Sequence, residues 1–96
     1  MTEEKSLRFE EVLKALRTGR AMRASRAGWN GKNMFVFLHK GENIHADKRS
    51  AYILSVDIGE LIYSYPYLSI RTSQNTIGPW RPTQIDMFAA DWCIEI

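Results

Sequence analysis

Apolar residues near the N-terminus recur with the period of an amphipathic helix. They stand at i, i+3, i+4 and i+7, which places them on one helical face: Phe9, Val12, Leu13 and Leu16. Glu10 and Glu11 fall in the first turn, where the helix dipole favours acids. Gly19 then supplies the left-handed conformation that commonly ends a helix. The pattern predicts a helix over residues 9–18.

Strand patterns dominate most of the remaining chain. Residues 34–39 form a continuous run of apolar, β-branched and aromatic side chains, which is the clearest strand signal. Residues 67–72 alternate and end in a polar turn at 73–75, where Asn75 is expected to be left-handed. A weaker strand is predicted at 20–24, and another at 76–80 with Pro79 on a sheet edge. A last strand is predicted at 92–96. Its one face would carry Trp92, Ile94 and Ile96, and its other face Cys93.

Three connecting segments carry weaker or mixed signals. Residues 27–32 read as a turn, with Gly28 and Gly31 on either side of Trp29. Residues 40–43 indicate a chain reversal. Residues 44–66 are apolar in patches without a clean period, so we expect a long, partly ordered loop containing strand pieces. Thr83 is predicted to cap a short helix that runs through Ala90.

These elements predict an α+β fold in which an N-terminal helix packs on an antiparallel β-sheet and a short second helix precedes the last strand. A chain of 96 residues has room for one cored unit, so residues 1–96 are expected to form a single domain.

Composition narrows the class of protein. Cys93 is the single cysteine, which excludes an internal disulfide framework. No apolar run approaches the ~20 residues of a membrane span, and the acidic, polar N-terminus does not resemble a signal peptide. We therefore expect a soluble protein of a reducing compartment. Three Trp, four Tyr and four Phe are more rings than so small a core can bury, which predicts that some lie at an interface or in a pocket.

The formal net charge of +2 conceals an uneven distribution. Residues 1–50 hold eleven Lys or Arg against six Asp or Glu, whereas residues 51–96 hold two against five. Residues 12–41 contain no acid and seven cations. This basic window either attracts phosphate groups or is a solvated positive face.

Catalytic and metal motifs are absent from the sequence. There is no nucleophile elbow, no phosphate-binding glycine loop and no zinc-protease helix motif. His39, His45 and Asp47 lack diagnostic metal-ligand spacing, and Cys93 has no basic neighbour in sequence to activate it. The sequence therefore predicts no enzyme, no metal and no cofactor.

Nucleotide binding has more support. Bases stack on flat aromatic faces, and phosphates bind Arg, Lys or backbone amides. Trp29 stands on a glycine-flanked turn beside Asn30 and Lys32, and Trp80 precedes Arg81. Each Trp has an equally good structural explanation as a plug at the end of a sheet, and Asp86 fits either a ribose acceptor or a helix N-terminal acid. The residue types alone therefore predict a protein that binds a ligand through aromatic and basic side chains.

Three motifs in order resemble one known family. They are Gly28-Trp-Asn-Gly-Lys-Asn-Met-Phe35, Pro79-Trp-Arg-Pro-Thr-Gln-Ile-Asp-Met87 and Ala90-Asp-Trp92. The chain looks like the Thoeris anti-defence 2 family of small phage and prophage proteins. The resemblance covers nearly the whole chain, except that residues 44–65 carry no motif that can be matched and Gln74-Asn75 stands where Asp-Gly is expected.

The resemblance implies a phage anti-defence protein that is not an enzyme. Members assemble as homotetramers and sequester cyclic nucleotide immune signals intact: cyclic ADP-ribose isomers and, in some members, cyclic oligonucleotides. It implies action in the cytoplasm of an infected or lysogenic bacterial host, with no membrane or nucleic-acid partner.

The matched motifs place the expected ligand contacts near Trp29, Asn30, Trp80 and Asp86, and we assign roles to these and neighbouring residues from their side-chain chemistry. Trp29 and Trp80 are candidates for stacking, and Asn30 and Asp86 are candidates for reading a base or ribose. The candidate phosphate partners are Arg26, Lys32 and Arg81. Two alternatives stay open: a nucleic-acid-binding accessory protein that uses the basic window, and a structural or virion-associated domain whose aromatic residues are all core and interface.

Overall fold

The computed structural model describes residues 2–96, with the side chains of residues 30–32 left out. Within that range, six strands form one antiparallel sheet in the order β1-β8-β2-β3-β6-β7, and β4 pairs with β5 in a separate two-stranded sheet. The strands are β1 (Glu3–Leu7), β2 (Arg23–Arg26), β3 (Phe35–His39), β4 (Glu42–His45), β5 (Leu61–Ser64), β6 (Tyr67–Arg71), β7 (Ile77–Pro79) and β8 (Trp92–Glu95). The helices are α1 (Phe9–Thr18), η1 (a 3₁₀ helix, Ala27–Lys32), α2 (Lys48–Leu54) and α3 (Gln84–Phe88).

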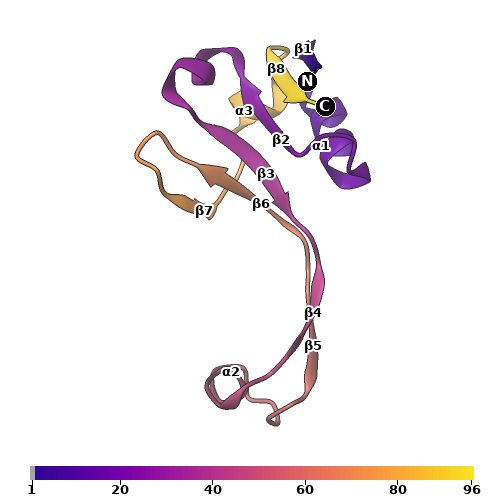
Figure 1. The fold of residues 1–96 in the computed structure, drawn as a ribbon, viewed down its shortest axis with the longest axis vertical. Coiled ribbons are helices and arrows are strands. Elements are labelled where there is room, and N and C mark those ends of the chain that lie inside the picture. The colour runs from indigo at the N-terminus through magenta and orange to yellow at the C-terminus, as the bar shows by residue number, and fades with distance from the viewer. Residues whose placement is uncertain (1) are drawn as a thin grey trace.

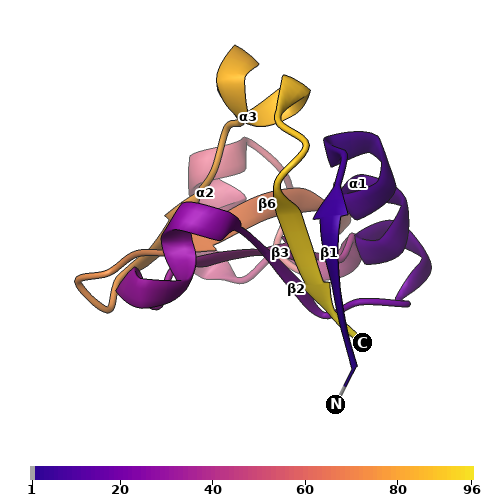
Figure 2. The same cartoon turned by 90° about the horizontal axis from the view of Figure 1, so that it is seen from above.

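The predicted α+β class is confirmed, and the first helix is confirmed at both ends. Helix α1 covers residues 9–18 as expected, and Gly19 closes it at φ 78°, in the left-handed region. Its apolar face packs on β8 and β3 (Figure 2), and Val12 and Leu16 are buried there with Val36, Ile94 and Trp92. Figure 1 shows both chain ends on this part of the molecule.

Four predicted strands lie close to their expected positions. Strand β3 occupies residues 35–39 and β6 residues 67–71, with Asn75 left-handed at φ 63° in the turn that follows. Strand β7 is the last strand of the sheet, which accommodates Pro79 on an edge. Strand β8 faces Trp92 and Ile94 into the core, while Ile96 lies beyond the strand end and is exposed.

Several boundaries were predicted wrongly. The second strand begins at Arg23 rather than Arg20, residues 27–32 form a 3₁₀ helix rather than a simple turn, and the helix after Thr83 ends at Phe88. Strand β1 was not predicted at all. Its residues are mostly polar because it is the outer strand of the sheet, paired with β8 through Glu3↔Glu95 and Glu4↔Ile94.

The largest difference concerns residues 40–66, which we call the arm. No reversal occurs at 40–43. Instead β3 and β6 are prolonged into the β4–β5 hairpin, which carries α2 near its far end and extends away from the rest of the protein, the body (Figure 1). The expected loop with strand pieces is thus an ordered strand–helix–strand unit. The molecule measures 47 × 28 × 28 Å, and its radius of gyration is 16.3 Å, whereas a compact chain of this length would have about 12–13 Å.

Gly41 lies where the arm leaves the body. A Cβ there would overlap the Tyr63 hydroxyl and come within 3.1 Å of Pro66 Cδ. A side chain at position 41 would therefore have to displace the Tyr63 ring.

We expect Gly41→Ala to displace the Tyr63 ring and destabilise the arm by about 1–2 kcal/mol, as overpacking does. Hydrogen exchange should then be faster at the amides of β4 and β5 and unchanged in β8. Gly28→Ala is the matched control, because a Cβ at Gly28 meets no atom within 4 Å. Equal protection of β4 and β5 in wild type and Gly41→Ala would contradict this packing.

No helix within residues 2–96 is both long and apolar enough to cross a membrane.

Candidate functional site

Three tryptophans from distant parts of the chain meet at one end of the core. Trp92 is fully buried, and its ring centroid lies 5.4 Å from that of Trp29 and 6.0 Å from that of Trp80. Trp29 and Trp80 are 6.3 Å apart at an interplanar angle of 88°. These edge-to-face arrangements are favourable for aromatic rings. Phe9 completes this tryptophan cluster at 5.5 Å from Trp92.

Local structure explains why each ring is held there. Trp29 belongs to η1, whose start is tied to the last strand region by a hydrogen bond from the Ala27 amide to the Asp91 carbonyl. Trp80 follows β7, and its amide donates to the Leu68 carbonyl at 2.9 Å. Both rings are half-buried. The structural role expected for each as a plug is therefore present, and each residue keeps part of its surface accessible.

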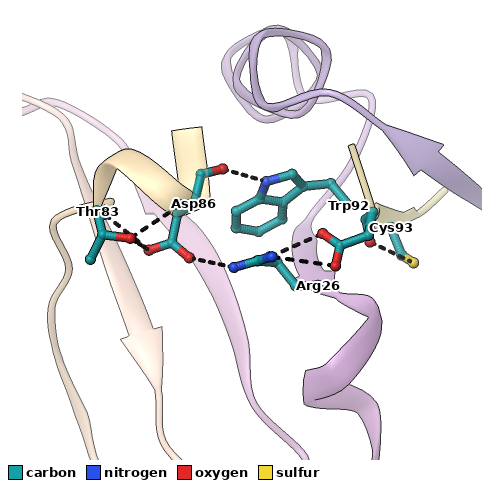
Figure 3. A network of polar contacts seen from close by, with 6 residues as sticks. Arg26, Thr83, Asp86, Trp92 and Cys93 are labelled. Atoms are coloured by element: carbon teal, nitrogen blue, oxygen red, sulfur yellow. Dashed lines mark hydrogen bonds and ion pairs between the residues drawn. The ribbon is translucent and has the colours of Figure 1, made fainter. Parts of the chain in front are cut away.

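A network of charged residues borders the cluster (Figure 3). The Arg26 guanidinium donates to both carboxylate oxygens of Asp91, at 3.0 and 3.4 Å, and to Asp86 Oδ1 at 3.1 Å. Asp86 also forms a capping box with Thr83 at the start of α3. The Trp92 indole donates to the Asp86 carbonyl at 2.8 Å, which joins this network to the tryptophan cluster.

The network fixes the charge states of its members. Burial raises the pKa of Asp86, but hydrogen bonds from Thr83 and Arg26 outweigh burial, so the pKa lies below its usual value. The pKa of Arg26 is raised, mainly by its hydrogen bond to Asp91. Burial raises the pKa of the Cys93 thiol, which disfavours the nucleophilic thiolate.

The seven predicted ligand-contact residues divide into three groups. Trp29 and Trp80 are brought together, and Arg81 follows Trp80 as an exposed residue. Arg26 and Asp86 are brought together as well, but their charges are directed at each other and at Asp91. The side chains of Asn30 and Lys32 lie outside the described residues.

A hollow lies beside the network, between the start of α1 and α3. It has a volume of about 470 Å³, which is within the range of small-molecule sites. Its lining comprises Arg8, Glu10, Met87, Phe88, Ala89 and Ala90. Trp29 and Trp80 do not line it.

The opposite face of the sheet carries an aromatic row that the sequence pattern did not reveal. Arg23 lies over the Phe35 ring at 4.7 Å, and Phe37 stands between Phe35 and His39. His39 stacks on Tyr67 at 4.7 Å. The sequence could have indicated this row, because the aromatic residues at positions 35, 37 and 39 alternate along a predicted strand and so share one of its faces.

The three residues considered as metal ligands make other contacts in the structure. His39 stacks on Tyr67, His45 Nδ1 lies 3.3 Å from the Gly59 carbonyl, and Asp47 caps α2 by accepting from the Ser50 amide. Among the residues that the structure describes, no group of three or more acidic, histidine or cysteine side chains is placed to hold a metal ion.

The basic window is partly neutralised. Arg20 is paired with Glu4, Arg23 with Glu95, and Arg26 with Asp86 and Asp91. Acids from outside the window thus engage three of its seven cations, and the predicted phosphate-attracting face is correspondingly interrupted.

Comparison with known proteins agrees with the motifs that run through this site. A model of the Thoeris anti-defense 2-like domain matches residues 7–95. The protein named Thoeris anti-defense 2 of Bacillus phage SP01 is 38% identical over 89 residues, covering 90% of this chain and 91% of the relative. The family match includes η1, α3 and the tryptophan cluster. This chain therefore belongs to the Thoeris anti-defense 2-like family of phage anti-defence proteins.

Proposed function

We propose that this protein binds a cyclic nucleotide immune signal and withholds it without cleaving it. The signal would be a cyclic ADP-ribose isomer or a cyclic oligonucleotide, and the protein would act as a homotetramer in the cytoplasm of the infected or lysogenic bacterial host. The observation that carries the proposal is the tryptophan cluster, in which Trp29 and Trp80 pack edge to face and are each only half-buried. Membership of an anti-defence family supports it.

The contacts suggest which part of the ligand each candidate residue binds. Trp29 and Trp80 stack on the base, and Arg81 binds phosphate, since it is exposed beside Trp80. Asn30 and Lys32 keep their proposed roles as base reader and phosphate partner. Arg26 and Asp86 position η1 against α3, because an incoming ligand could bind them only by displacing their mutual ion pair.

The proposal requires binding without chemistry. The thiol of Cys93 has a raised pKa, and the Asp86 carboxylate is hydrogen-bonded by Thr83 and Arg26. Neither group is therefore suited to attack a phosphate or to accept a proton, and the proposal assigns no general base. A ligand that is bound should leave the protein unchanged.

We expect purified protein to retain a nucleotide when it is mixed with cyclic ADP-ribose isomers or cyclic oligonucleotides and separated from free ligand. Heat denaturation should release a nucleotide with the mass and chromatographic behaviour of the one added. Recovery of a hydrolysed product would contradict binding without cleavage, and no retention across the panel would contradict nucleotide binding.

Arg81→Ala should weaken retention about tenfold, the loss of one charge-assisted phosphate contact. Arg17→Ala is the matched control, because Arg17 is also exposed but lies on α1, away from the tryptophan cluster. Calorimetric titration of both variants measures the difference. If the two variants bind the nucleotide with equal affinity, Arg81 does not contact the ligand.

A further inference from the structure

The hollow between the start of α1 and α3 combines an apolar wall with two charged side chains. The two helices lie next to each other (Figure 2), and the hollow has a volume of about 470 Å³. Residues 87–90 form the apolar wall, and Arg8 and Glu10 supply the charged part of the lining. Phe88 is 85% exposed, so much of the wall faces solvent. Apolar surface with a few placed polar groups is the usual makeup of a small-molecule site.

Arg8 is a cation without an acidic partner in the part of the chain that the structure describes. The ion pairs there engage three arginines of the basic window, whereas Arg8 and Arg81 are exposed and take part in none of them. Glu10 lines the same hollow but is not paired with Arg8 either. The guanidinium of Arg8 is therefore available to an anion, and guanidinium groups bind phosphate through paired hydrogen bonds.

The hollow adjoins the tryptophan cluster through Phe9. Phe9 directly follows Arg8, and its ring centroid lies 6.1 Å from that of Trp80. On the other side of the hollow, Ala89 packs against the core that contains Trp92. The hollow and the proposed stacking residues are thus neighbours, with one aromatic side chain between Arg8 and the Trp80 ring.

The ligands of the proposed function carry more than one phosphate. A cyclic ADP-ribose isomer has two phosphates joined as a pyrophosphate, and a cyclic dinucleotide has two separate phosphodiesters. Arg26 is engaged by its own ion pairs, so Arg81 is the one proposed phosphate partner whose described side chain is unpaired. A second phosphate calls for a second cation, which Arg8 supplies. Glu10 beside it can accept a hydrogen bond from a ribose hydroxyl.

We propose that the hollow is a second part of the nucleotide site, in which Arg8 binds one phosphate and the apolar wall of α3 covers the adjoining ribose or base. The inference rests on the proposed function, because it concerns the same ligand as the tryptophan cluster. It makes the protein selective for nucleotides with two phosphates, which span both parts, over nucleotides with one.

The test is calorimetric titration with whichever cyclic ADP-ribose isomer or cyclic oligonucleotide the wild-type protein retains. Arg8→Ala should weaken binding about tenfold, the loss of one charge-assisted phosphate contact. Arg8→Lys should recover part of that loss, because it restores the charge without the paired hydrogen bonds. Binding to Arg8→Ala should also depend less on salt than binding to wild type, since one contact between opposite charges is gone. A purely structural role of Arg8 would not change the salt dependence.

Phe88→Ser tests the apolar wall separately. Phe88 is too exposed to support the core, so this variant should fold as wild type does. It should bind the same nucleotide about fivefold more weakly, because less apolar ligand surface is removed from water. Met22→Ser is the matched control, since Met22 is 79% exposed and does not line the hollow. Arg17→Ala is the control for Arg8, because Arg17 is an exposed cation in the last turn of the same helix.

Weaker binding by Arg8→Ala and Phe88→Ser, with both controls unchanged, supports the proposal. Equal affinity of Arg8→Ala and wild type, or an equal loss in Arg17→Ala, overturns it and leaves sequestration by the tryptophan cluster standing. A change in the mass of Arg8→Ala by light scattering also overturns it, because Arg8 would then act through assembly. If Phe88→Ser binds as wild type does, α3 does not cover the ligand. A wild-type protein that retains no nucleotide contradicts the proposed function itself.

Discussion

Trp92→Ala is expected to lower the free energy of unfolding by about 3–5 kcal/mol, the usual loss for a buried tryptophan. Trp92 has no exposed surface, and its ring contacts Phe9, Trp29 and Trp80. Truncation would leave a cavity among all three neighbours and remove the indole donor from the Asp86 carbonyl. Urea unfolding followed by circular dichroism, at one fixed protein concentration, measures the loss.

Trp92→Phe is a milder change than Trp92→Ala, because it removes the indole donor but only part of the ring volume. It keeps an aromatic ring in the core but leaves the Asp86 carbonyl without the indole donor, which should cost about 1–3 kcal/mol. Trp29→Ala should cost less than Trp92→Ala, because Trp29 is half-buried and makes no hydrogen bond through its ring among the contacts described. A loss below about 1 kcal/mol for Trp92→Ala would contradict the cluster's structural role.

The body of the fold was largely predictable because its elements bury apolar faces within one chain. Helix α1 shows its period since Val12 and Leu16 face the sheet, and β3 is recognisable because Val36 and Leu38 pack against the core. Strand β1 was missed for the opposite reason. Apart from Leu7 its residues are polar, and its position depends on a pairing with β8 that lies almost ninety positions away.

The arm was mispredicted because most of its large apolar side chains are exposed and do not pack on the core. Tyr52, Ile53 and Leu54 are consecutive and all exposed on α2, so they produce no helical period. The signal that could have revealed α2 was its capping residues, Asp47 and Ser50, which bond reciprocally at the helix start.

The candidate site was predictable only in its aromatic part. Trp29 and Trp80 were found through motifs, and the structure places their rings 6.3 Å apart. The ion pairs of Arg26 join residues 60 and 65 positions apart in sequence. Sequence spacing carries no information about such pairs, so Arg26 and Asp86 looked like free ligand contacts rather than partners of each other.

The Arg26–Asp86 pair predicts how stability depends on pH. Because the folded protein holds the pKa of Asp86 below its usual value, its contribution is fully present above the pKa of the unfolded chain, about 3.9. That contribution is lost as pH falls through the lower pKa of the folded state. Wild-type stability should therefore decline below about pH 4.

Asp86→Asn should remove much of the loss of stability at acid pH. It should also lower the free energy of unfolding by about 2–3 kcal/mol at neutral pH, because Arg26 and Thr83 would no longer donate to a charged carboxylate. Urea midpoints between neutral and acid pH measure both effects. Asp57→Asn is the matched control, because Asp57 is exposed and lies in the arm, away from this network; it should keep the wild-type slope. If Asp86→Asn loses stability with acid as steeply as wild type, the carboxylate of Asp86 is not the source of the acid sensitivity, and its ion pair with Arg26 contributes little to stability.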